Sequence, residues 1–371
     1  MGRCGLRRER MLKMKKIKKI GVLTSGGDAP GMNAAVRAIT NKATAEGIEV
    51  VGIIGGYAGL LEKNYTTLTP ESVSCVIGRG GTFIYTARCT EFATELGVQK
   101  AVATCRELGI DALVAIGGDG TFRGATDMST HGVPTIGIPG TIDNDITATD
   151  YTVGYDTAQN TALKLVDCLR DTCESHSRVN VVEMMGRNCG ELTLNVGIAS
   201  GAVAVAIPEI PFDADAAIAH IDNLAKEGKR GMIVAVSEGV FTEDGKPFGE
   251  VFTKRLINEI GADAKFARLA HVQRGGEPTL RDRKTASVMG AMAIDLIMDG
   301  KSDLVLCELD GEIKPINIRW ALMVDRMYKN KLKDGDLDAF TAEEIDEMKA
   351  LCAKRKADIE RLYSVAQSLA R

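Results

Sequence analysis

The sequence predicts an α/β protein in which mostly parallel sheets are covered by helices. The main observation is a repeated order of apolar strand, glycine-rich turn, helix and next strand, which is typical of βαβ units. Composition agrees, since 45% of the residues are apolar, glycine is abundant and only 5% are aromatic. At 371 residues the chain is too long for one ordinary domain. We therefore expect two Rossmann-like, three-layer α/β/α domains.

Charge and cysteine usage exclude several classes of protein. The net charge of −4 argues against a nucleic-acid partner, and no apolar run is long enough to span a membrane. Nine cysteines without a C-x-x-C pair are typical of free thiols in a reducing cytoplasm. Residues 1–16 are basic but lack the apolar core of a secretory signal. We interpret them as a disordered leader or a misassigned start, with Met11 or Met14 as the true beginning.

Four apolar segments in the first half of the chain predict strands, each followed by a turn. They are 17–24, 50–54, 111–116 and 134–138. Helix-forming residues run from Met32 to about Glu46, where Gly47 is a plausible stop, and again over 98–108. A further helix precedes the fourth strand. We expect residues 60–88 to be irregular.

The second half repeats this order. Strands are expected at 179–183, 202–207 and 232–236, and an amphipathic helix at 157–169. Thr341 and Glu344 predict a capping box at the start of a long C-terminal helix. Packing by its apolar stripe is a sufficient explanation of that helix, so we assign it no chemistry.

Ligands bind at the carboxyl ends of the strands in open parallel sheets, so the loops that follow the strands are candidate sites. Five loops fall there, namely 25–31, 55–57, 117–121, 139–145 and 185–190. The glycines of the first could leave backbone N–H groups and a helix N-terminus free to cradle phosphate. It is neither a Walker loop nor a good dinucleotide fingerprint, and a simple tight turn is the alternative.

Two of these loops carry carboxylates. Asp119 lies among glycines in the turn 117–121, where it could hold Mg²⁺ beside phosphate. In the loop 139–145, an extended chain would send Thr141, Asp143 and Asp145 to one side, which suits a metal, a proton transfer or both. The alternative is a turn rich in Asp and Asn, whose side chains bond their own backbone.

Phosphoryl transfer is the reaction that these parts would serve together. A metal-holding acid, a base and phosphate-binding amides position the substrates and neutralise charge, which accounts for most of the catalysis in this reaction. Cations for the transferred group could come from four arginines near glycine turns, namely Arg88, Arg178, Arg187 and Arg274. Each of them could equally be a solvated surface residue.

Five ordered motifs resemble the 6-phosphofructokinase family over roughly residues 17–325. They are GVLTSGGDAPGMNAA at 21–35, IGGDGT at 116–121, PGTIDND at 139–145, MGR at 185–187 and HVQRGG at 271–276. The resemblance implies two α/β domains with the active site in the cleft between them. It also implies phosphate transfer to the 1-hydroxyl of fructose 6-phosphate in glycolysis, by a homo-oligomer (a dimer or tetramer) with shared active sites.

The resemblance also implies roles for individual residues. Asp143 would be the general base with Thr141 beside it, and Asp119 would hold Mg²⁺ with Asp145 nearby. A carboxylate with an ordinary pKa of roughly 3.9 would be ionised at pH 7. The nucleotide contacts would be Gly27, Tyr57, Arg88, Cys89, Gly118, Asp119, Gly120 and Thr121. The sugar-phosphate contacts would be Thr141, Asp143, Asp145, Met185, Gly186, Arg187, Glu238, His271 and Arg274, with Arg187 and Arg88 also acting in catalysis.

Two glycines favour ATP over pyrophosphate as the phosphate donor. Members of the family that use pyrophosphate usually carry Asp where this chain has Gly120 and Lys where it has Gly140. An Asp side chain would crowd the α-phosphate and adenosine of ATP, and Lys would bind the charge of pyrophosphate. We therefore expect ATP as co-substrate together with Mg²⁺, and a pyrophosphate-dependent enzyme is the alternative.

The chain departs from the family pattern at positions that contact phosphate. Arg178 matches an arginine that the family lends to the active site of a neighbouring subunit. The second lent arginine aligns with Lys265, although Arg268 lies nearby, and Lys lacks the fork of Arg. These residues would complete the sugar-phosphate site of another copy.

A second departure concerns regulation. In the effector site of bacterial members, Arg37 and Lys229 remain, but two arginines are replaced by Asn41 and Pro70. We expect weak or absent allostery. The tail after about residue 318 also differs from the short bacterial enzymes.

The expected domain bounds follow the resemblance. A nucleotide-binding domain would comprise residues 17–154 and about 274–323, and a sugar-phosphate-binding domain would comprise 155–273 and about 324–371. Other functions share parts of the pattern, since the GGDGT turn also occurs in NAD kinases and lipid kinases. The motifs at 139–145 and 271–276 argue against those kinases. A non-catalytic sugar-phosphate or nucleotide sensor would have little need to keep Asp119, Thr141 and Asp143 together.

Overall fold

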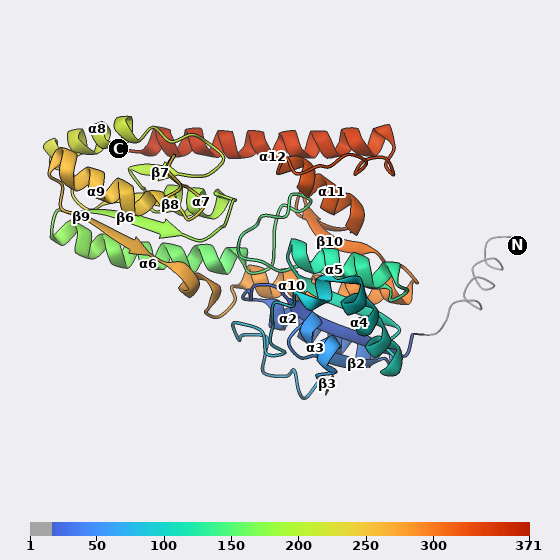
Figure 1. Cartoon of the computed structure of the whole chain (residues 1–371). Helices are drawn as coiled ribbons and strands as arrows, with labels where there is room; N and C mark the ends of the chain where they lie inside the picture. Colours follow the sequence, from blue (N-terminus) through green and yellow to red (C-terminus); the bar gives the residue numbers. More distant parts are fainter. Residues whose placement is uncertain (1–16) are drawn as a thin grey trace, which may run out of the picture.

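The computed structural model describes residues 17–371, which form two separate β-sheets (Figure 1). The larger sheet has seven strands, in the spatial order β11 (Glu312–Asn317), β10 (Leu304–Leu309), β5 (Thr135–Pro139), β4 (Ala112–Gly117), β1 (Lys19–Ser25), β2 (Glu49–Ile53) and β3 (Tyr65–Leu68). The smaller has four, in the order β7 (Ala204–Ala206), β8 (Met232–Ser237), β6 (Val179–Met184) and β9 (Ala264–Arg268). The leader proposed for residues 1–16 lies outside the described residues.

Parallel pairing dominates both sheets, as expected from the repeated strand–turn–helix order. The small sheet is parallel throughout its described strands. In the large sheet only the two edge strands β3 and β11 run antiparallel to their neighbours. The α/β class predicted from the sequence is therefore confirmed.

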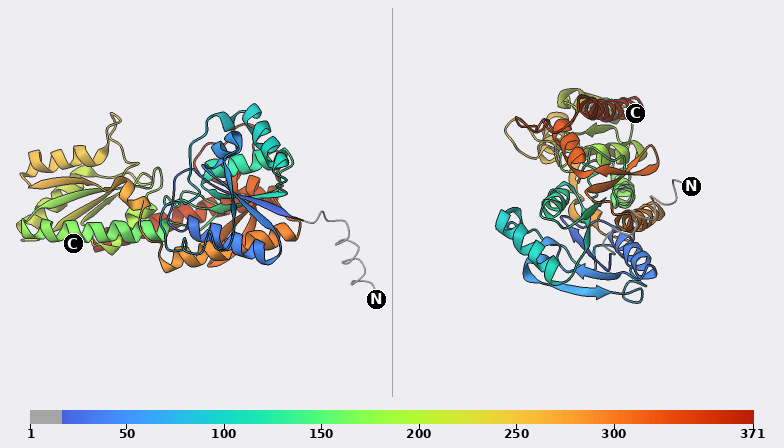
Figure 2. Two further views of the ribbon diagram at one scale, coloured as in Figure 1. Left: turned by 90° about the horizontal axis from the view of Figure 1, so that it is seen from below. Right: turned by 90° about the vertical axis from the view of Figure 1, so that its right-hand side faces the viewer.

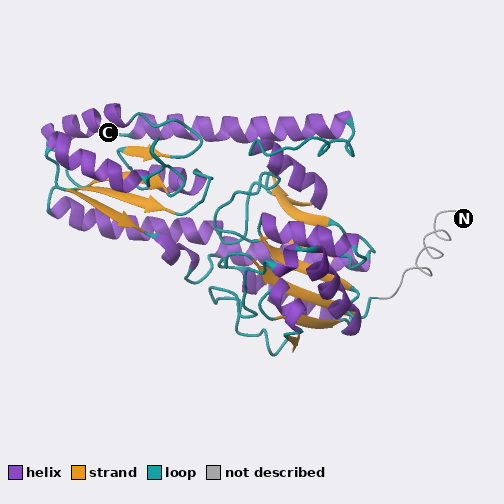
Figure 3. Cartoon of the chain, in the orientation of Figure 1, coloured by secondary structure: helices purple, strands orange, loops and turns teal. Residues whose placement is uncertain are grey.

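Helices cover both faces of each sheet, which gives three layers in each half (Figure 3). On the large sheet, one face carries α2 (Met32–Ala45) and α10 (Leu280–Met298), and the other carries α3 (Tyr57–Glu62), α4 (Glu95–Glu107), α5 (Asp119–Thr130) and α11 (Ile318–Tyr328). On the small sheet, one face carries α6 (Tyr155–Ser175) and α7 (Glu191–Ala199), and the other carries α8 (Ala214–Lys226) and α9 (Phe248–Ile260). Two short 3₁₀ helices, η1 (Glu91–Ala93) and η2 (Ala270–Arg274), complete the two halves.

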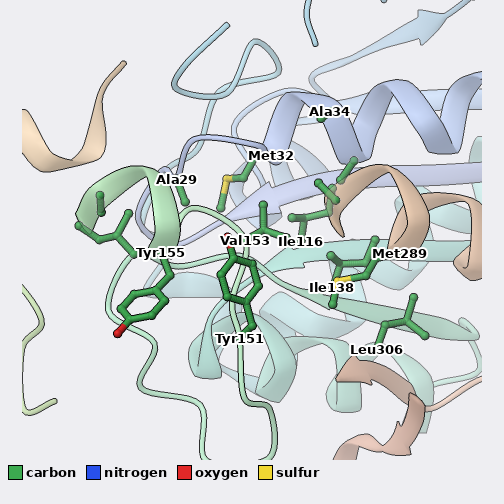
Figure 4. Packing of buried hydrophobic residues seen from close by; sticks show 14 of the residues in the cluster. Ala29, Met32, Ala34, Ile116, Ile138, Tyr151, Val153, Tyr155, Met289 and Leu306 are labelled. Carbon is green, nitrogen blue, oxygen red and sulfur yellow. The ribbon is translucent and has the colours of Figure 1, made fainter. Parts of the chain in front are cut away.

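The core follows from the alternation of side chains along the strands. In β1, Ile20 and Val22 point to the α2–α10 face, whereas Leu23 points to the opposite face. Figure 4 shows the first of these cores, with Met32 of α2 and Met289 of α10 close to the strand residues. The same core continues to the small sheet, so the two halves share one body of buried apolar side chains.

A long C-terminal helix, α12 (Ala342–Leu369), lies along both halves of the molecule (Figure 1). The predicted capping box is confirmed, because Thr341 Oγ1 accepts from the Glu344 N–H and the Glu344 carboxylate accepts from the Thr341 N–H. Met348 packs into the core below the large sheet, while Ile359 packs into the core shared with the small sheet. Figure 2 shows α6 running from the small sheet toward the large one as a second connection.

The strands predicted from the sequence are all confirmed, with ends shifted by a residue or two. The prediction that residues 60–88 are irregular is wrong in part, because α3 ends within this segment and β3 follows it. The sequence of β3 is YTTL, and only its last residue is buried. A polar strand at the edge of a sheet has no apolar alternation to reveal it.

Two further expectations concern the described residues only. No helix within 17–371 combines the length and the apolarity needed to cross a bilayer. The cysteines in the same part of the chain are free, as the absence of a C-x-x-C pair predicted.

Candidate active site

Three loops of the large sheet begin at the same level because their strands are in register. Ser25 pairs with Gly117, and Gly117 pairs with Pro139, so the carboxyl ends of β1, β4 and β5 lie next to one another. The Gly140 N–H donates to the Gly117 carbonyl at 3.0 Å, which holds the third loop against the second. Strand register thus brings together the loops 25–31, 117–121 and 139–145.

A cavity of about 450 Å³ opens above these strand ends. Its lining contains residues from all five predicted loops and from the arginine set. Of the predicted site residues, the lining includes Gly27, Tyr57, Arg88, Cys89, Gly118, Asp119, Gly120, Thr121, Thr141, Asp145, Arg187 and Arg274. A space of this size lined by glycine amides and cations suits a phosphate-bearing ligand.

The N-terminus of α5 forms one wall of this cavity. Gly118 is its N-cap, and the Thr121 side chain donates to the Ser25 carbonyl at 3.0 Å, which ties the first turn to β1. The Tyr57 hydroxyl donates to the Thr121 carbonyl at 2.8 Å, and the Tyr57 ring stacks on Phe92. Burial raises the pKa of Tyr57 well above its ordinary value. The helix turn that would receive phosphate is therefore held rigidly.

Asp119 and Asp145 provide carboxylate oxygens on the wall of the same cavity. Burial raises the pKa of Asp119, and the nearby Asp325 and Asp145 add to this effect, while its ion pair with Arg123 opposes it. Among residues 17–371 no cluster of three or more metal-binding side chains occurs. Mg²⁺ needs only one or two carboxylates when phosphate and water supply its other ligands. The donor set thus fits a magnesium ion that arrives with a nucleotide.

The loop 139–145 is a turn and not an extended chain, which corrects the predicted geometry. The Asp143 N–H donates to Thr141 Oγ1 at 3.2 Å, and Asn144 adopts the left-handed conformation with φ 48°. Asn tolerates this conformation better than most residues. Its side chain donates to Glu191 and accepts from Thr152. Thr141, Asp143 and Asp145 therefore do not lie along one strand face, although they remain close together.

Asp143 is the most deeply buried carboxylate of the loop, with 1% of its side chain exposed. Its Oδ2 lies 3.1 Å from Arg187 Nε, and its Oδ1 has no hydrogen-bond partner. Burial raises its pKa to about 6, with a further contribution from Asp145, and Arg274 and Arg187 counteract the shift in part. The prediction of an ordinary pKa is therefore wrong, since the sequence could not reveal how little water reaches this carboxyl.

The small sheet supplies the opposite wall. Gly186 and Arg187 follow β6 in positive-φ conformations, and Glu238, which follows the neighbouring β8, accepts from both of their N–H groups at 3.2 and 2.9 Å. The Met185 N–H donates to Gln273 Oε1 at 2.9 Å. Glu238 thus holds the strained turn that presents Arg187 to Asp143. The sequence analysis gave Gln273 no role although it lies within the HVQRGG motif, and its buried contact with Met185 supplies one.

Arg274 and His271 come from η2, which lies between the two halves. Arg274 Nη1 donates to the Asp28 carbonyl at 3.2 Å. A Cβ on Gly27 would lie 2.6 Å from the same nitrogen, so a larger residue at this position would require the Arg274 side chain to shift. His271 is exposed on the same short helix.

Arg178 and Lys265 do not join this site within one chain. Both pair with Asp263, at 2.8 and 2.6 Å, at the amino ends of β6 and β9. The carboxyl end of β6, which leads to Arg187, lies about 20 Å away at the usual rise of a strand. In this chain these two predicted substrate contacts face away from Asp143.

The site has the features of a phosphotransferase, since helix amides and several arginines surround one cavity and a buried carboxylate contacts one of those arginines. Residues 19–297 match the family model described as Phosphofructokinase. The chain therefore belongs to the phosphofructokinase family. The family predicted from the five motifs is confirmed.

Curated relatives are similar over most of this chain. An ATP-dependent 6-phosphofructokinase of Clostridioides difficile is 46% identical over 312 residues, which cover 84% of this chain and 96% of the relative. An enzyme of Thermus thermophilus, ATP-dependent 6-phosphofructokinase 1, is 48% identical over 299 residues, which cover 80% of this chain and 91% of the relative.

Solved structures agree on the fold. A phosphofructokinase from Saccharomyces cerevisiae is 32% identical with a TM-score of 0.78, and the match covers 90% of this chain and 50% of the yeast chain. This chain thus spans about half the length of the yeast chain. A pyrophosphate-dependent phosphofructokinase from Marinobacter aquaeolei is 21% identical with a TM-score of 0.72. That match covers 81% of this chain and 83% of the other, and it shows a shared fold.

Proposed function

We propose that the chain is an ATP-dependent 6-phosphofructokinase. It transfers the γ-phosphate of ATP to the 1-hydroxyl of fructose 6-phosphate in glycolysis and releases ADP and fructose 1,6-bisphosphate. The observation that carries the proposal is the buried Asp143 carboxylate, which contacts Arg187 on the wall of the cavity that the N-terminus of α5 also lines. The curated relatives named above support the choice of donor and acceptor.

Asp143 acts as the general base in this proposal. It accepts the proton of the 1-hydroxyl while that oxygen forms a bond to the γ-phosphorus. The bond from the γ-phosphorus to the bridging oxygen breaks, and ADP keeps its electron pair. Asp143 Oδ1 is free to receive the proton because nothing else donates to it. A pKa of about 6 leaves the carboxylate ionised at pH 7 and makes it a stronger base than an ordinary aspartate.

Cations and amides stabilise the transferred phosphoryl group. Arg187, Arg88 and Arg274 line the cavity together with the first turn of α5, whose free N–H groups favour anions. Asp119, with Asp145 nearby, would hold Mg²⁺, which when bound neutralises charge on the phosphates. The side chains of this chain orient the two substrates so that the hydroxyl and the phosphorus meet.

The donor is tested most cleanly at Gly120. A Cβ at this position would meet nothing within 4 Å, so Gly120→Asp adds a carboxylate without disturbing the fold. A Cβ at Gly140 would lie 3.2 Å from both Ile116 Cγ2 and Met32 Cε, so a change there would also disturb packing. Gly120→Ala is the matched control, because it adds bulk but no charge.

The experiment measures fructose 1,6-bisphosphate formed with ATP and, separately, with pyrophosphate. The wild-type chain should turn over ATP and leave pyrophosphate unused. Gly120→Asp should lower kcat/KM for ATP about 100-fold or more by charge repulsion and crowding, and Gly120→Ala should lower it only a few-fold. Undiminished ATP kinetics in Gly120→Asp, or faster turnover with pyrophosphate in the wild type, would contradict ATP as the donor.

We also propose a division of labour between the two halves. Residues 17–154 and about 274–323 bind the nucleotide, and residues 155–273 and about 324–371 bind the sugar phosphate. The sheets support this division, because strands β1–β5, β10 and β11 of the first set form the large sheet and strands β6–β9 of the second set form the small one. The free cysteines of the described part support action in the cytoplasm.

Active sites shared between subunits of a homo-oligomer complete the proposal. The position of Arg178 and Lys265 at the amino ends of β6 and β9, the end of the small sheet away from Asp143, supports their use by a neighbouring copy. A complementation assay tests it. Arg178→Ala and Asp143→Ser chains should each be inactive, and hybrids made by unfolding and refolding them together should regain activity. Hybrids that stay inactive while both parents refold would contradict shared sites.

A further inference from the structure

The C-terminal part of the chain holds the loop 143–150 from the side opposite the cavity that contains the proposed site. This contact joins segments more than 170 residues apart in the sequence. Lys329, which ends α11, contributes two contacts to it. Its Nζ donates to the Asp145 carbonyl at 2.8 Å and lies 3.8 Å from the Asp145 carboxylate.

Asp325 and Arg355 extend the same attachment. Asp325 Oδ1 accepts from the Thr147 N–H and hydroxyl at 3.3 and 3.0 Å, and its Oδ2 pairs with Lys329 Nζ at 2.8 Å. Arg355 of α12 donates to the Thr147 carbonyl at 3.4 Å and pairs with Asp150 at 3.3 Å. Side chains of the C-terminal region therefore satisfy the backbone groups of a loop that has no regular structure of its own.

Apolar side chains also join the loop to the C-terminal region, because Ile146 and Ala148 are buried in the same core as Leu322 of α11 and Met348 of α12. A second cavity, of about 310 Å³, lies behind the loop, and its lining includes Asp145, Thr147, Lys329 and Arg355. Beside this cavity, polar contacts hold Asp145 and Thr147, whereas apolar packing holds the neighbouring Ile146 and Ala148.

Lys329 has no place in the cavity of the proposed active site. That cavity is lined by Asp145 but not by Lys329, so the lysine touches the loop from behind. Asp145 lies two positions after the base Asp143 in the sequence. A shift of Asp145 would therefore move the carboxyl group that has to meet the sugar hydroxyl.

We propose that Lys329 is a positioning residue for phosphoryl transfer, acting through Asp145 to hold Asp143 in reach of the hydroxyl. The proposal rests on the function assigned to Asp143 above. It gives the C-terminal region a part in the reaction, whereas the sequence suggested only a packing helix. A displacement of about 1 Å at a reacting group can cost about 100-fold in rate, while substrate binding elsewhere is kept.

The experiment compares three variants by steady-state kinetics and by hydrogen exchange of the loop amides. Lys329→Met should lower kcat about 10-fold to 100-fold and leave KM for both substrates within about threefold, because Lys329 contacts neither the arginines nor the glycine amides that would bind the substrates. Amides of residues 143–150 should exchange faster. Lys329→Arg keeps the charge and should restore most of kcat. Lys349→Met, at an exposed lysine of α12 paired with Asp346, is the control and should behave as wild type.

A fourth variant separates an effect on catalysis from a loss of folding. Lys329→Met leaves Asp325 as a buried unpaired acid, so the double variant Asp325→Asn/Lys329→Met removes both charges together. It should unfold at a temperature near that of the wild type and still show the loss of kcat. Unchanged kcat in the folded double variant, or a change confined to KM, would overturn the proposal. If Asp143→Ser keeps wild-type turnover, the assignment of Asp143 as the base is wrong. This result does not depend on any change at Lys329, so the two proposals can fail separately.

Discussion

The front and the back of the loop 139–150 differ in how well their polar groups are satisfied. At the front, Asp143 is buried with an unpartnered Oδ1, and its closest cation is the exposed Arg187. At the back, Asp145, Thr147 and Asp150 are held by ion pairs and hydrogen bonds from the C-terminal region. The Asp143 carboxylate at the front lacks a hydrogen-bond partner on one oxygen, whereas Asp145, Thr147 and Asp150 at the back all have partners.

The loop therefore keeps its least satisfied carboxylate on the side where the reaction would take place. A carboxyl that is buried and only partly neutralised weakens the folded state, but it is also a more effective base. Such a group persists only if its surroundings determine its position. The ion pairs behind the loop provide this support, so changes at the front and the back should have opposite effects on stability and unequal effects on activity.

The largest expected effect is the loss of the base. Asp143→Ser should lower kcat by about 10²–10⁴ with KM largely kept, since proton transfer is lost but the binding groups remain. Asp150→Asn changes an aspartate at the back of the same loop and should cost less than about tenfold. Steady-state kinetics with ATP and fructose 6-phosphate measure both. A sensor that is not an enzyme would lose nothing measurable in either variant.

Removing the charge of Asp143 should raise the stability of the folded chain, although it lowers activity. The pKa of Asp143 is raised from 3.8 to about 6, so its favourable contribution is present below pH 4 and is lost as the pH rises through 6. Asp143→Asn removes this penalty and should raise the free energy of unfolding at pH 7 by up to about 3 kcal/mol.

Thermal unfolding without ligands at pH 7 and at pH 4 checks this gain, which should be small at pH 4. At the back, Asp325→Asn should lower stability at pH 7 by about 1–3 kcal/mol, because it weakens the contacts of a buried acceptor. If Asp143→Asn and Asp325→Asn changed the free energy of unfolding by the same amount and in the same direction, the front and the back of the loop would not differ as described.

The pH dependence of the rate follows from the same carboxyl. The base works when it is ionised, so kcat/KM for fructose 6-phosphate should fall about tenfold per pH unit below an apparent pKa of about 6. An ordinary aspartate would keep the rate level to about pH 4. Initial rates between pH 4.5 and 8, with stability checked at each pH, distinguish the two profiles.

The smallest expected effect is the response of the rate to allosteric effectors. The family resemblance places Asn41 and Pro70 where bacterial members carry effector-site arginines. Lys229, which this chain retains together with Arg37, donates to the carbonyl of Arg371. We expect a hyperbolic dependence of rate on fructose 6-phosphate that ADP and phosphoenolpyruvate change little. A sigmoidal curve that ADP relieves would show that the effector response is intact.

Much of the site could be predicted from the sequence because its parts are local. Glycine turns after apolar strands indicated the loops at 117–121 and 139–145, and strand register did bring them to one edge. The capping box at Thr341 is likewise a short-range pattern. Patterns of this kind involve residues within a few positions of one another. The family motifs at 185–187 and 271–276 add Arg187 and Arg274 to the residues that could be predicted.

How these parts act on one another depends on contacts between distant segments of the chain. The turn at Asn144 and the raised pKa of Asp143 depend on what surrounds the loop and on how little water reaches it. The contacts of Gln273 with Met185 and of Lys329 with Asp145 join segments far apart in the chain. The sequence by itself determined which chemical groups the strand ends carry. Burial and long-range contacts decided their protonation and position, because both arise from neighbours that no local pattern records.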